Sequence, residues 1–514
     1  MTTQTAGDDL VALARGGRTN FLGFLLRLAA RLPFLFIAGR AYGADALGRY
    51  AYAVLIVEFA AQLATLGLKR GLAQQLATTD KPHVCVVADA MLVAFVASAI
   101  ASLILGFFPQ AMFPNSAIHG VEWLLPLIVF AIAGADVALA ALAYRHNVHA
   151  TVTARAIVEP WTISMAAFAF SFVSSRDGLI FSYVLAMLAA LIASLWPLLR
   201  SYGLPHGWRP DPVTLWNLAR RNTPLAAADA IEWGSRRIDI ALLGLFFSPA
   251  IVGIYYVAQQ VASLPQKLKT SFDPILSPVI TQKLAEGDRA AVARQVRQVG
   301  FWIIAAQTGV ALALGIPGEA VMGLVGPHFV GGTGALSFLL AAEVVAATAA
   351  VSEGALIYIA RHRNLMISTL MIIVEAGLAV VFILAARRLN LTPTAQAAGP
   401  AIALCLALAM ASVLKARLLS RLLEAPVSGW RWALVWAAAV ATAVGYLATL
   451  APEWGELLFG MPLILFSFGT VIWKRGFTPE DRILFRRKPK TEKATLPPPE
   501  GSTPEETGFR KASR

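Results

Sequence analysis

Long apolar stretches recur along this chain, and each is about as long as a membrane-spanning helix. About 20 consecutive apolar residues suffice for an α-helix to cross a bilayer. Hydropathy predicts fourteen such spans, at residues 19–41, 47–68, 84–108, 120–144, 154–174, 178–199, 222–247, 250–281, 298–316, 334–360, 364–386, 394–414, 432–450 and 454–473. Backbone polar groups in lipid must be satisfied internally, so each stretch predicts a helix. We therefore predict an all-α, polytopic membrane protein with about 14 transmembrane helices.

Composition and charge placement agree with a membrane protein. Hydrophobic residues make up 57% of the chain and charged residues 14%, whereas a soluble protein is about 25% charged. The net charge of +13 would also suit nucleic-acid binding, but the cations cluster in alternate short loops and in the C-terminal tail. Few of the 43 Lys and Arg residues fall in loops on the opposite side, namely Arg40, Arg49, Arg176, Arg387 and Arg388. The positive-inside rule then predicts a bacterial inner-membrane protein with both termini in the cytoplasm.

Some charged residues fall inside the predicted spans. The cations are Arg27, Arg31, Arg236, Arg237, Lys267 and Lys269. The acids at plausible membrane depth are Asp136, Glu159, Asp229, Glu232, Asp239, Asp273, Glu343 and Glu375. A charge at the centre of a bilayer costs at least about 2.5–3.5 kcal/mol, so such residues usually face a wet interior and line a transport pathway. This placement indicates a protein that moves something across the membrane.

The densest group of these charges lies in the predicted span 222–247. In a continuous helix, four of them share one stripe, because their spacing is three or four residues each time. They are Asp229, Glu232, Arg236 and Asp239, with Trp233 and Arg237 beside them. The preceding residues 208–221 carry tryptophans and arginines and predict a short helix at the membrane surface. Residues 282–297 predict a second surface helix.

A weak internal repeat with an offset of 205 residues divides the chain into two similar halves. Its matched pairs are Arg31 with Arg236, Gly48 with Gly253, Tyr50 with Tyr255 and Ala53 with Ala258. Transporters often build such repeats, with the substrate site between them near mid-membrane. The predicted organisation is an N-terminal tail (1–18), an N-lobe of six helices (19–200), a linker (201–221), a C-lobe of six helices (222–419), two further helices (420–474) and a disordered cytoplasmic tail (475–514).

Several short segments resemble the polysaccharide biosynthesis proteins, which are Wzx-like lipid-linked oligosaccharide flippases of the multidrug/oligosaccharidyl-lipid/polysaccharide exporter superfamily. The segments are Gly48 to Ala53, Leu66 to Leu68, Arg237 to Asp239, Val252 to Ala258 and Pro278 to Gly287. The resemblance extends over residues 19 to about 475. It implies two six-helix lobes around a central cavity that opens alternately to either side. It also implies a polyprenyl-pyrophosphate-linked sugar as the cargo.

Basic and aromatic residues within the spans are candidates for contact with such a cargo, because arginine binds phosphate oxygens bidentately. The candidates are Arg27, Arg31, Arg236, Arg237, Lys267, Trp233 and Tyr255. Each also has a structural explanation. Arg27 can extend toward the inner headgroups, Arg236 can pair with Glu232 or Asp239, and the aromatic rings can simply pack between helices.

Buried acids in a transporter are candidate proton or cation carriers, since burial favours the uncharged carboxyl. We select Glu232, Asp239 and Asp229 as ion-coupling candidates. Arg155 and Glu159 are spaced for an ion pair at a helix end. Neither a metal site nor a cofactor motif is evident, and the chain has no Walker A sequence.

The expected function is a flippase that carries a polyprenyl-pyrophosphate-linked oligosaccharide across the inner membrane for exopolysaccharide, capsule or O-antigen synthesis. Expected partners are that glycan, membrane lipids and possible polymerase machinery, without nucleic acid. An ion-coupled multidrug or cation exporter of the same superfamily is one alternative. A membrane glycan polymerase or ligase is another, although the predicted outer loops are too short to hold a large reactive domain. We expect no enzymatic activity.

Overall fold

A computed structural model describes residues 33–118, 120–145, 147–234, 237–270, 280, 282–284, 286–478 and 481 of the chain. The side chains of Val148, Glu232 and residues 267–270 fall outside this description. Every regular element within the described ranges is a helix, which confirms the all-α prediction. Nine helices in these ranges are long and apolar enough to span a membrane. Most of the predicted first span, with Arg27 and Arg31, lies outside the described residues.

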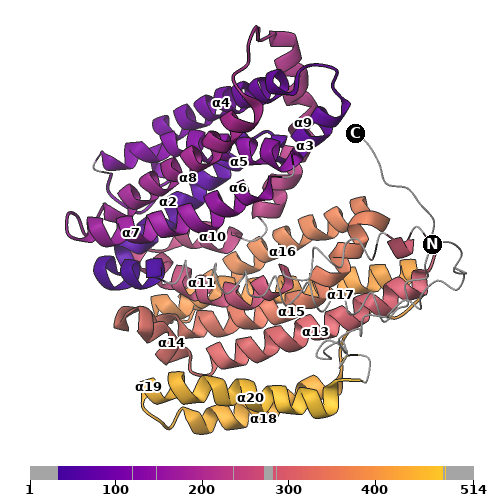
Figure 1. Ribbon diagram of the computed structural model, residues 1–514. Coiled ribbons are helices and arrows are strands. Elements are labelled where there is room, and N and C mark those ends of the chain that lie inside the picture. The colour runs from indigo at the N-terminus through magenta and orange to yellow at the C-terminus, as the bar shows by residue number, and fades with distance from the viewer. Residues whose placement is uncertain are drawn as a thin grey trace, which may run out of the picture.

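The N-terminal half forms one group of helices, drawn in indigo and purple in Figure 1. Its principal elements are η1 (Ala38–Tyr42), α2 (Gly43–Ala64), α3 (Leu68–Thr78), α4 (His83–Phe107), α5 (Leu125–Tyr144), α6 (Val148–Val152), η4 (Thr153–Val158), α7 (Glu159–Ser171) and α8 (Gly178–Tyr202). Short 3-10 turns, η2 (Pro109–Ala111) and η3 (Val121–Leu124), connect α4 to α5. The helix α5 lies at the centre of this group, because it packs against α2, α3, α4 and α8.

The C-terminal half forms a second group, drawn mainly in orange. Its elements are α10 (Ile238–Phe246), α11 (Pro249–Thr270), α13 (Arg289–Gly315), α14 (Gly318–Val325), η5 (Pro327–Gly332), α15 (Thr333–Ile359), α16 (Arg361–Arg388) and α17 (Pro393–Leu423). The helix α15 is central here, since it packs against α11, α13 and α17. We call the first group of helices the N-lobe and the second the C-lobe.

Several predicted elements differ from the observed helices. A sharp turn at Leu66 and Gly67, both with positive φ, separates α2 from α3, which the sequence placed in a loop. The predicted surface helix 282–297 is largely the first part of α13, which continues directly into the span. The predicted surface helix 208–221 is likewise the beginning of α9 (Pro212–Gly234). In both cases the helix continues from the basic stretch into the apolar residues that follow, and in α9 it does so through Pro224.

The helix α9 packs against α2, α3 and α4 of the N-lobe. Its residue Leu218 is buried in the same apolar cluster as Leu72 and Leu142. Residues 222–234, which the sequence assigned to the C-lobe, therefore lie against N-lobe helices. The change from one lobe to the other occurs after Gly234, between α9 and α10.

The lobes meet where α2 packs against α11, and two glycines allow the close approach. A Cβ atom at Gly48 would lie 1.7 Å from the carbonyl oxygen of Pro249. A Cβ atom at Gly253 would lie 2.0 Å from the carbonyl oxygen of Ala44. Gly48 and Gly253 are a matched pair of the repeat, and Ala44 and Pro249 are separated by the same 205 residues. The contact is therefore reciprocal, as pseudo-two-fold symmetry requires.

Further hydrogen bonds join the lobes at the end predicted to lie outside the cell. The Arg40 Nε donates to the carbonyl oxygen of Leu324 in α14 over 3.1 Å. The Asn115 amide of the N-lobe donates to the carbonyl oxygens of Gly244 (2.7 Å) and Phe247 (2.9 Å) in the C-lobe. These contacts hold the two lobes together at this end.

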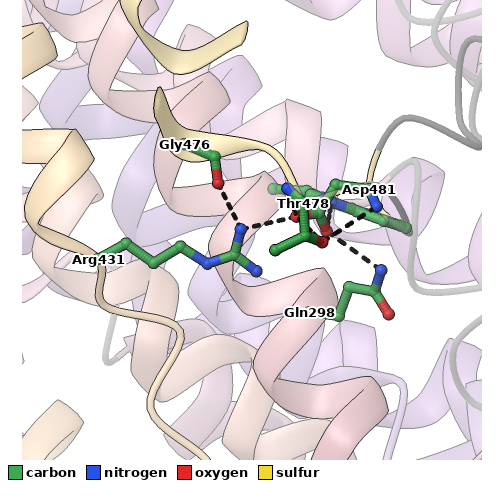
Figure 2. A network of polar contacts seen from close by, with 6 residues as sticks. Gln298, Arg431, Gly476, Thr478 and Asp481 are labelled. Carbon is green, nitrogen blue, oxygen red and sulfur yellow. Dashed lines mark hydrogen bonds and ion pairs between the residues drawn. The ribbon is translucent and has the colours of Figure 1, made fainter. Parts of the chain in front are cut away.

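The last helices form a separate layer, yellow in Figure 1, that packs on α13. They are α18 (Trp432–Ala448), α19 (Glu453–Gly455), η6 (Glu456–Gly460), α20 (Met461–Val471) and η7 (Ile472–Gly476). Beyond η7, Asp481 is fully buried although the sequence placed it in the disordered tail. Its carboxylate accepts hydrogen bonds from Arg431 (2.6 Å), the Trp302 indole (2.9 Å) and the Gln298 amide (3.1 Å), as Figure 2 shows in part. Thr478 and Asp481 bond each other's backbone N–H groups, which is a helix capping box.

Candidate functional site

The predicted charged span 222–247 is not one continuous helix. The helix α9 ends at Gly234, and α10 begins at Ile238 after Arg237, whose φ of −142° and ψ of 5° are not helical. Asp229 and Asp239, which lie on either side of this break, therefore do not share the face of one continuous helix, contrary to the prediction. The other two charges of the predicted stripe, Arg236 and the side chain of Glu232, lie outside the described residues. Glycine is poorly suited to a helix interior, which is a local reason for a break at this place. The break lies where the chain passes from α9, which packs on the N-lobe, to α10, which packs on α11, α16 and α17 of the C-lobe.

Arg237, at this break, forms an ion pair with Glu58 of α2. Its guanidinium also lies over the ring of Trp233, 4.6 Å from the ring centroid. Trp233 packs against Phe59, the neighbour of Glu58, with ring centroids 5.5 Å apart. Arg237 remains 39% exposed and Glu58 28%, so this pair is not sealed within the protein. From the sequence we expected Glu232 or Asp239 as an ion-pair partner of Arg236. The partner of Arg237, Glu58, was not predicted.

Asp239 begins the C-lobe side of the break and is 1% exposed. Its carboxylate accepts hydrogen bonds from the Tyr255 hydroxyl (2.8 Å), the Gln259 amide (3.0 Å) and the backbone N–H of Ile240 (2.8 Å). Tyr255 is also 1% exposed and therefore offers no ring face to a sugar in this conformation. Tyr255 therefore positions Asp239. This agrees with a residue that packs between helices rather than with a ring that stacks on the cargo.

Glu375 of α16 is a second buried carboxyl group close to Asp239. It is 1% exposed, and neither of its carboxylate oxygens has a hydrogen-bond partner among the described residues. Asp239 and Glu375 interact electrostatically, because α10 packs against α16. Two buried carboxyl groups at this proximity disfavour a state in which both are ionised.

The N-lobe carries its own half-buried ion-pair cluster. Arg155 in the π-helical segment η4 contacts Asp136 of α5 and, over 3.0 Å, Glu159. The contact of Arg155 with Glu159 agrees with the ion pair that their spacing in the sequence predicts. The contact with Asp136 also links α5 to the segment that leads into α7. Tyr183 lies nearby and hydrogen bonds to Glu58 over 3.5 Å. Tyr183 of α8 and Arg237 thus both contact Glu58.

The remaining predicted site residues are less informative. Arg27, Arg31 and Arg236 lie outside the described residues, as do the side chains of Glu232 and Lys267. Asp229 is buried in α9 and accepts an ion pair from Arg70 of α3 over 2.8 Å. It faces the N-lobe, whereas Asp239 faces the C-lobe. Of the predicted set, the structure brings Trp233 and Arg237 together at the break and joins Tyr255 to Asp239.

Two residues of this site were missed by the sequence. Glu58 lies in the middle of a predicted span, and its isolation between Val57 and Phe59 was a signal of an intramembrane acid. Glu375 was counted among the intramembrane acids but was not selected, because nothing in the sequence relates α16 to α10. Its proximity to Asp239 exists only in the folded chain.

Comparisons with known proteins agree with this architecture. A family model described as "Polysaccharide biosynthesis protein" matches residues 39–313, which is more than half of the chain. A solved structure of the lipid II flippase MurJ, in an inward closed conformation, superposes with a TM-score of 0.66 at 11% identity, covering 88% of this chain and 98% of that one. No match is found among curated proteins.

Two structures described as transporters of the MOP superfamily have the same fold. The inward-facing conformation of a multidrug resistance MATE family transporter superposes with a TM-score of 0.61 at 12% identity, covering 78% of this chain and 99% of that one. A transporter from Pyrococcus furiosus superposes with a TM-score of 0.54 at 12% identity, covering 82% and 99%. These similarities confirm the expected all-helical, polytopic fold.

Proposed function

The chain belongs to the polysaccharide biosynthesis protein family, and we propose that it is a flippase for a polyprenyl-pyrophosphate-linked oligosaccharide. The cargo would enter from the cytoplasmic leaflet of the bacterial inner membrane and leave on the outer side. Both termini would lie in the cytoplasm. Rocking of the N-lobe and C-lobe about the α2–α11 contact would expose the space between them to each side in turn.

The observation that supports this proposal is the Arg237–Glu58 pair at the break between α9 and α10. A guanidinium binds phosphate in the same bidentate way as it binds a carboxylate. A pyrophosphate that enters between the lobes can therefore replace Glu58 as the partner of Arg237. Partial exposure of both side chains provides the access that such an exchange needs. Trp233 would remain beneath the guanidinium as a fixed platform.

We propose that Asp239 and Glu375 couple this transport to an ion. Both carboxyl groups are buried in the C-lobe, yet α10 begins at the break that also carries Arg237. Binding or loss of a proton or a monovalent cation at this pair would change how α10 packs on α16. Asp229 is less suited to this role, because it already has Arg70 as a partner.

The same buried acids favour one other candidate function, an ion-coupled multidrug or cation exporter. A cationic cargo would need an acidic cavity, whereas the exposed member of this site, Arg237, is basic. A glycan polymerase or ligase has no support from the family or from the similar structures.

Deletion of the gene distinguishes the flippase from the exporter. Lipid-linked oligosaccharides would be extracted from the deletion strain, and their exposure on each leaflet would be measured. Accumulation on the cytoplasmic side is the expected result. Unchanged glycans together with altered drug tolerance would instead identify an exporter.

Variants of the break residues test the proposed site itself. We expect Arg237→Gln to lower translocation by about tenfold or more, which corresponds to the loss of one charge-assisted hydrogen bond. Arg388→Gln, an exposed arginine in a predicted outer loop, is the matched control and should keep full activity. Arg31→Ala and Arg236→Ala should leave the protein in the membrane but stop translocation. Full activity of all three site variants would exclude arginine binding of the cargo.

A further inference from the structure

A separate hollow of about 310 Å³ lies at the end of the molecule predicted to face the cytoplasm. Its lining residues come from α3, α9 and the first residue of α16, namely Gly71, Gln74, Gln75, Arg221, Asn222, Pro224, Leu225 and Arg361. The helices α3 and α9 pack on the N-lobe, whereas α16 belongs to the C-lobe. The hollow is thus formed jointly by both lobes, away from the helix break that carries Arg237.

The charge of this hollow is entirely positive. Arg221 and Arg361 are its only charged lining residues, and the polar remainder consists of the side-chain amides of Gln74, Gln75 and Asn222. Within the described chain, the Arg221 side chain hydrogen bonds only to the Gln75 side chain, over a long 3.4 Å. The Arg361 side chain has no hydrogen bond or ion pair there. Like charges repel when they line one space, so an anion between them would be stabilising.

The N-lobe wall of the hollow is closely packed. A Cβ atom at Gly71 would lie 1.7 Å from the side-chain oxygen of Asn222, so only glycine admits Asn222 at this distance. Asn222 is buried, and its amide nitrogen donates to the carbonyl oxygen of Leu218 over 2.8 Å. Because this wall is held by α3 and α9 together, the position of Arg221 relative to Gln75 does not depend on the C-lobe.

We propose that this hollow binds a phosphate group, held between Arg221 and Arg361. The bidentate geometry of guanidinium suits phosphate oxygens, and the neighbouring amides can donate to the remaining oxygens. Arg361 begins α16, so the positive end of the helix dipole adds to its charge. The phosphate would come either from an anionic phospholipid at the inner leaflet or from a soluble phosphate or pyrophosphate. This site requires no assumption about the transported molecule.

A phosphate at this position would also act on the arrangement of the lobes. Arg221 moves with the N-lobe body and Arg361 with the C-lobe, so both can hold one ligand only while their present separation is kept. A ligand that binds one arrangement better shifts the population toward it. Bound phosphate would therefore favour the conformation in which the outer ends are joined.

Binding can be measured on the purified full-length protein in two arms. In one arm, protein in uncharged detergent is titrated with inorganic pyrophosphate at constant ionic strength. In the other, protein in nanodiscs of phosphatidylcholine is compared with protein in nanodiscs that contain phosphatidylglycerol, by native mass spectrometry of retained lipid. We expect binding in at least one arm, and the arm identifies the source of the phosphate.

Four single variants then test the assignment to these arginines. Arg221→Gln and Arg361→Gln should each weaken binding by about tenfold or more. Arg220→Gln and Arg363→Gln remove the same charge from exposed residues on the same helices that do not line the hollow, and should change binding less than about twofold. Equal losses in all four variants, or no binding in either arm, would overturn the proposal.

A distance measurement tests the effect on the lobes. Spin labels would be placed at Lys69 of α3 and His362 of α16, beside the hollow but outside its lining. The ligand identified by the binding arms should narrow the distance distribution in the wild-type background and leave it unchanged in Arg361→Gln. A distribution that does not respond in the wild type would refute the conformational part of the proposal.

Discussion

The two repeats use matched positions in different ways. In the C-lobe, Tyr255 donates a hydrogen bond to Asp239, and both are buried beside α16. The equivalent positions in the N-lobe, 205 residues earlier, are Tyr50 and Phe34. There the two rings pack together with centroids 5.6 Å apart, and no carboxyl group replaces Phe34. Equivalent backbone positions thus hold a buried acid in one lobe and an aromatic contact in the other.

The glycine contact is symmetric because both lobes need it in order to pack, whereas the buried acid at the position of Asp239 is present in one lobe only. The glycines Gly48 and Gly253 are equivalent in both sequence and contact, because the lobes must approach through both of them. Asp239 has no such counterpart, since a buried acid is costly and is retained only where it has a role. Glu58, one of the acids of the N-lobe, instead pairs with Arg237 at the break. Ion coupling is accordingly expected from the C-lobe.

The largest effect is expected from breaking the shared glycine contact. Gly48→Val and Gly253→Val would each force α2 and α11 apart, at a cost of about 3 kcal/mol, the upper part of the range for overpacking. Both variants should lose transport and thermal stability to a similar degree. Gly377→Ala is the control, because a Cβ at Gly377 meets no atom within 4 Å. A large difference between the two valine variants would argue against a reciprocal contact.

The next largest effect concerns the acid found only in the C-lobe. Asp239→Ala removes the acceptor of the Tyr255 hydroxyl and the Gln259 amide, which leaves buried donors unsatisfied at a cost of about 2 kcal/mol. We expect lower thermal stability together with a loss of ion-driven transport, measured in proteoliposomes with an imposed gradient. Asp239→Asn keeps the shape and should lose coupling with less destabilisation. Transport that still follows the gradient in both variants would exclude Asp239 as the carrier.

The C-terminal segment around Asp481 is another feature without an N-lobe equivalent. Burial alone would raise the pKa of Asp481, but hydrogen bonds from Arg431, Thr478 and Trp302 outweigh it and lower the pKa. Because the pKa of Asp481 is lower in the folded protein, the ionised carboxylate stabilises the fold at pH values above its ordinary pKa of 3.8. This stabilisation is lost as the pH falls through the folded-state pKa. Asp481→Asn should therefore cost about 1.5 kcal/mol at neutral pH. The difference in melting temperature from wild type should shrink below about pH 4, and a constant difference would contradict this account.

The smallest effect is expected at the N-lobe position that corresponds to Asp239. Phe34→Leu keeps an apolar side chain of similar size and should cost about 1 kcal/mol. Ion coupling should be unchanged in this variant, as measured by the same gradient-driven transport assay used for the Asp239 variants. A change in coupling as large as that of Asp239→Asn would show that the two lobes share the coupling function.

The amino-acid sequence by itself determined the helical membrane fold and the duplication. Long apolar runs leave the backbone in lipid no alternative to helices, and the matched glycines mark positions where two helices approach closely. Arg237 and Asp239 were also recognisable, because a charged residue inside an apolar run can be identified from its neighbours in the sequence. These features depend on residues close together in the sequence or on repeated positions, so they can be read from the sequence.

Only the tertiary structure decided which charges meet. Because the helix breaks after Gly234, Asp229 pairs with Arg70 in the N-lobe and Asp239 accepts a hydrogen bond from Tyr255 in the C-lobe. A continuous helix would have placed Asp229 and Asp239 on one face. The pair of Arg237 with Glu58 joins residues 179 positions apart. Partner choice at such separations depends on how the helices pack, because many acids and bases lie at similar depth and only the packed lobes bring particular ones together.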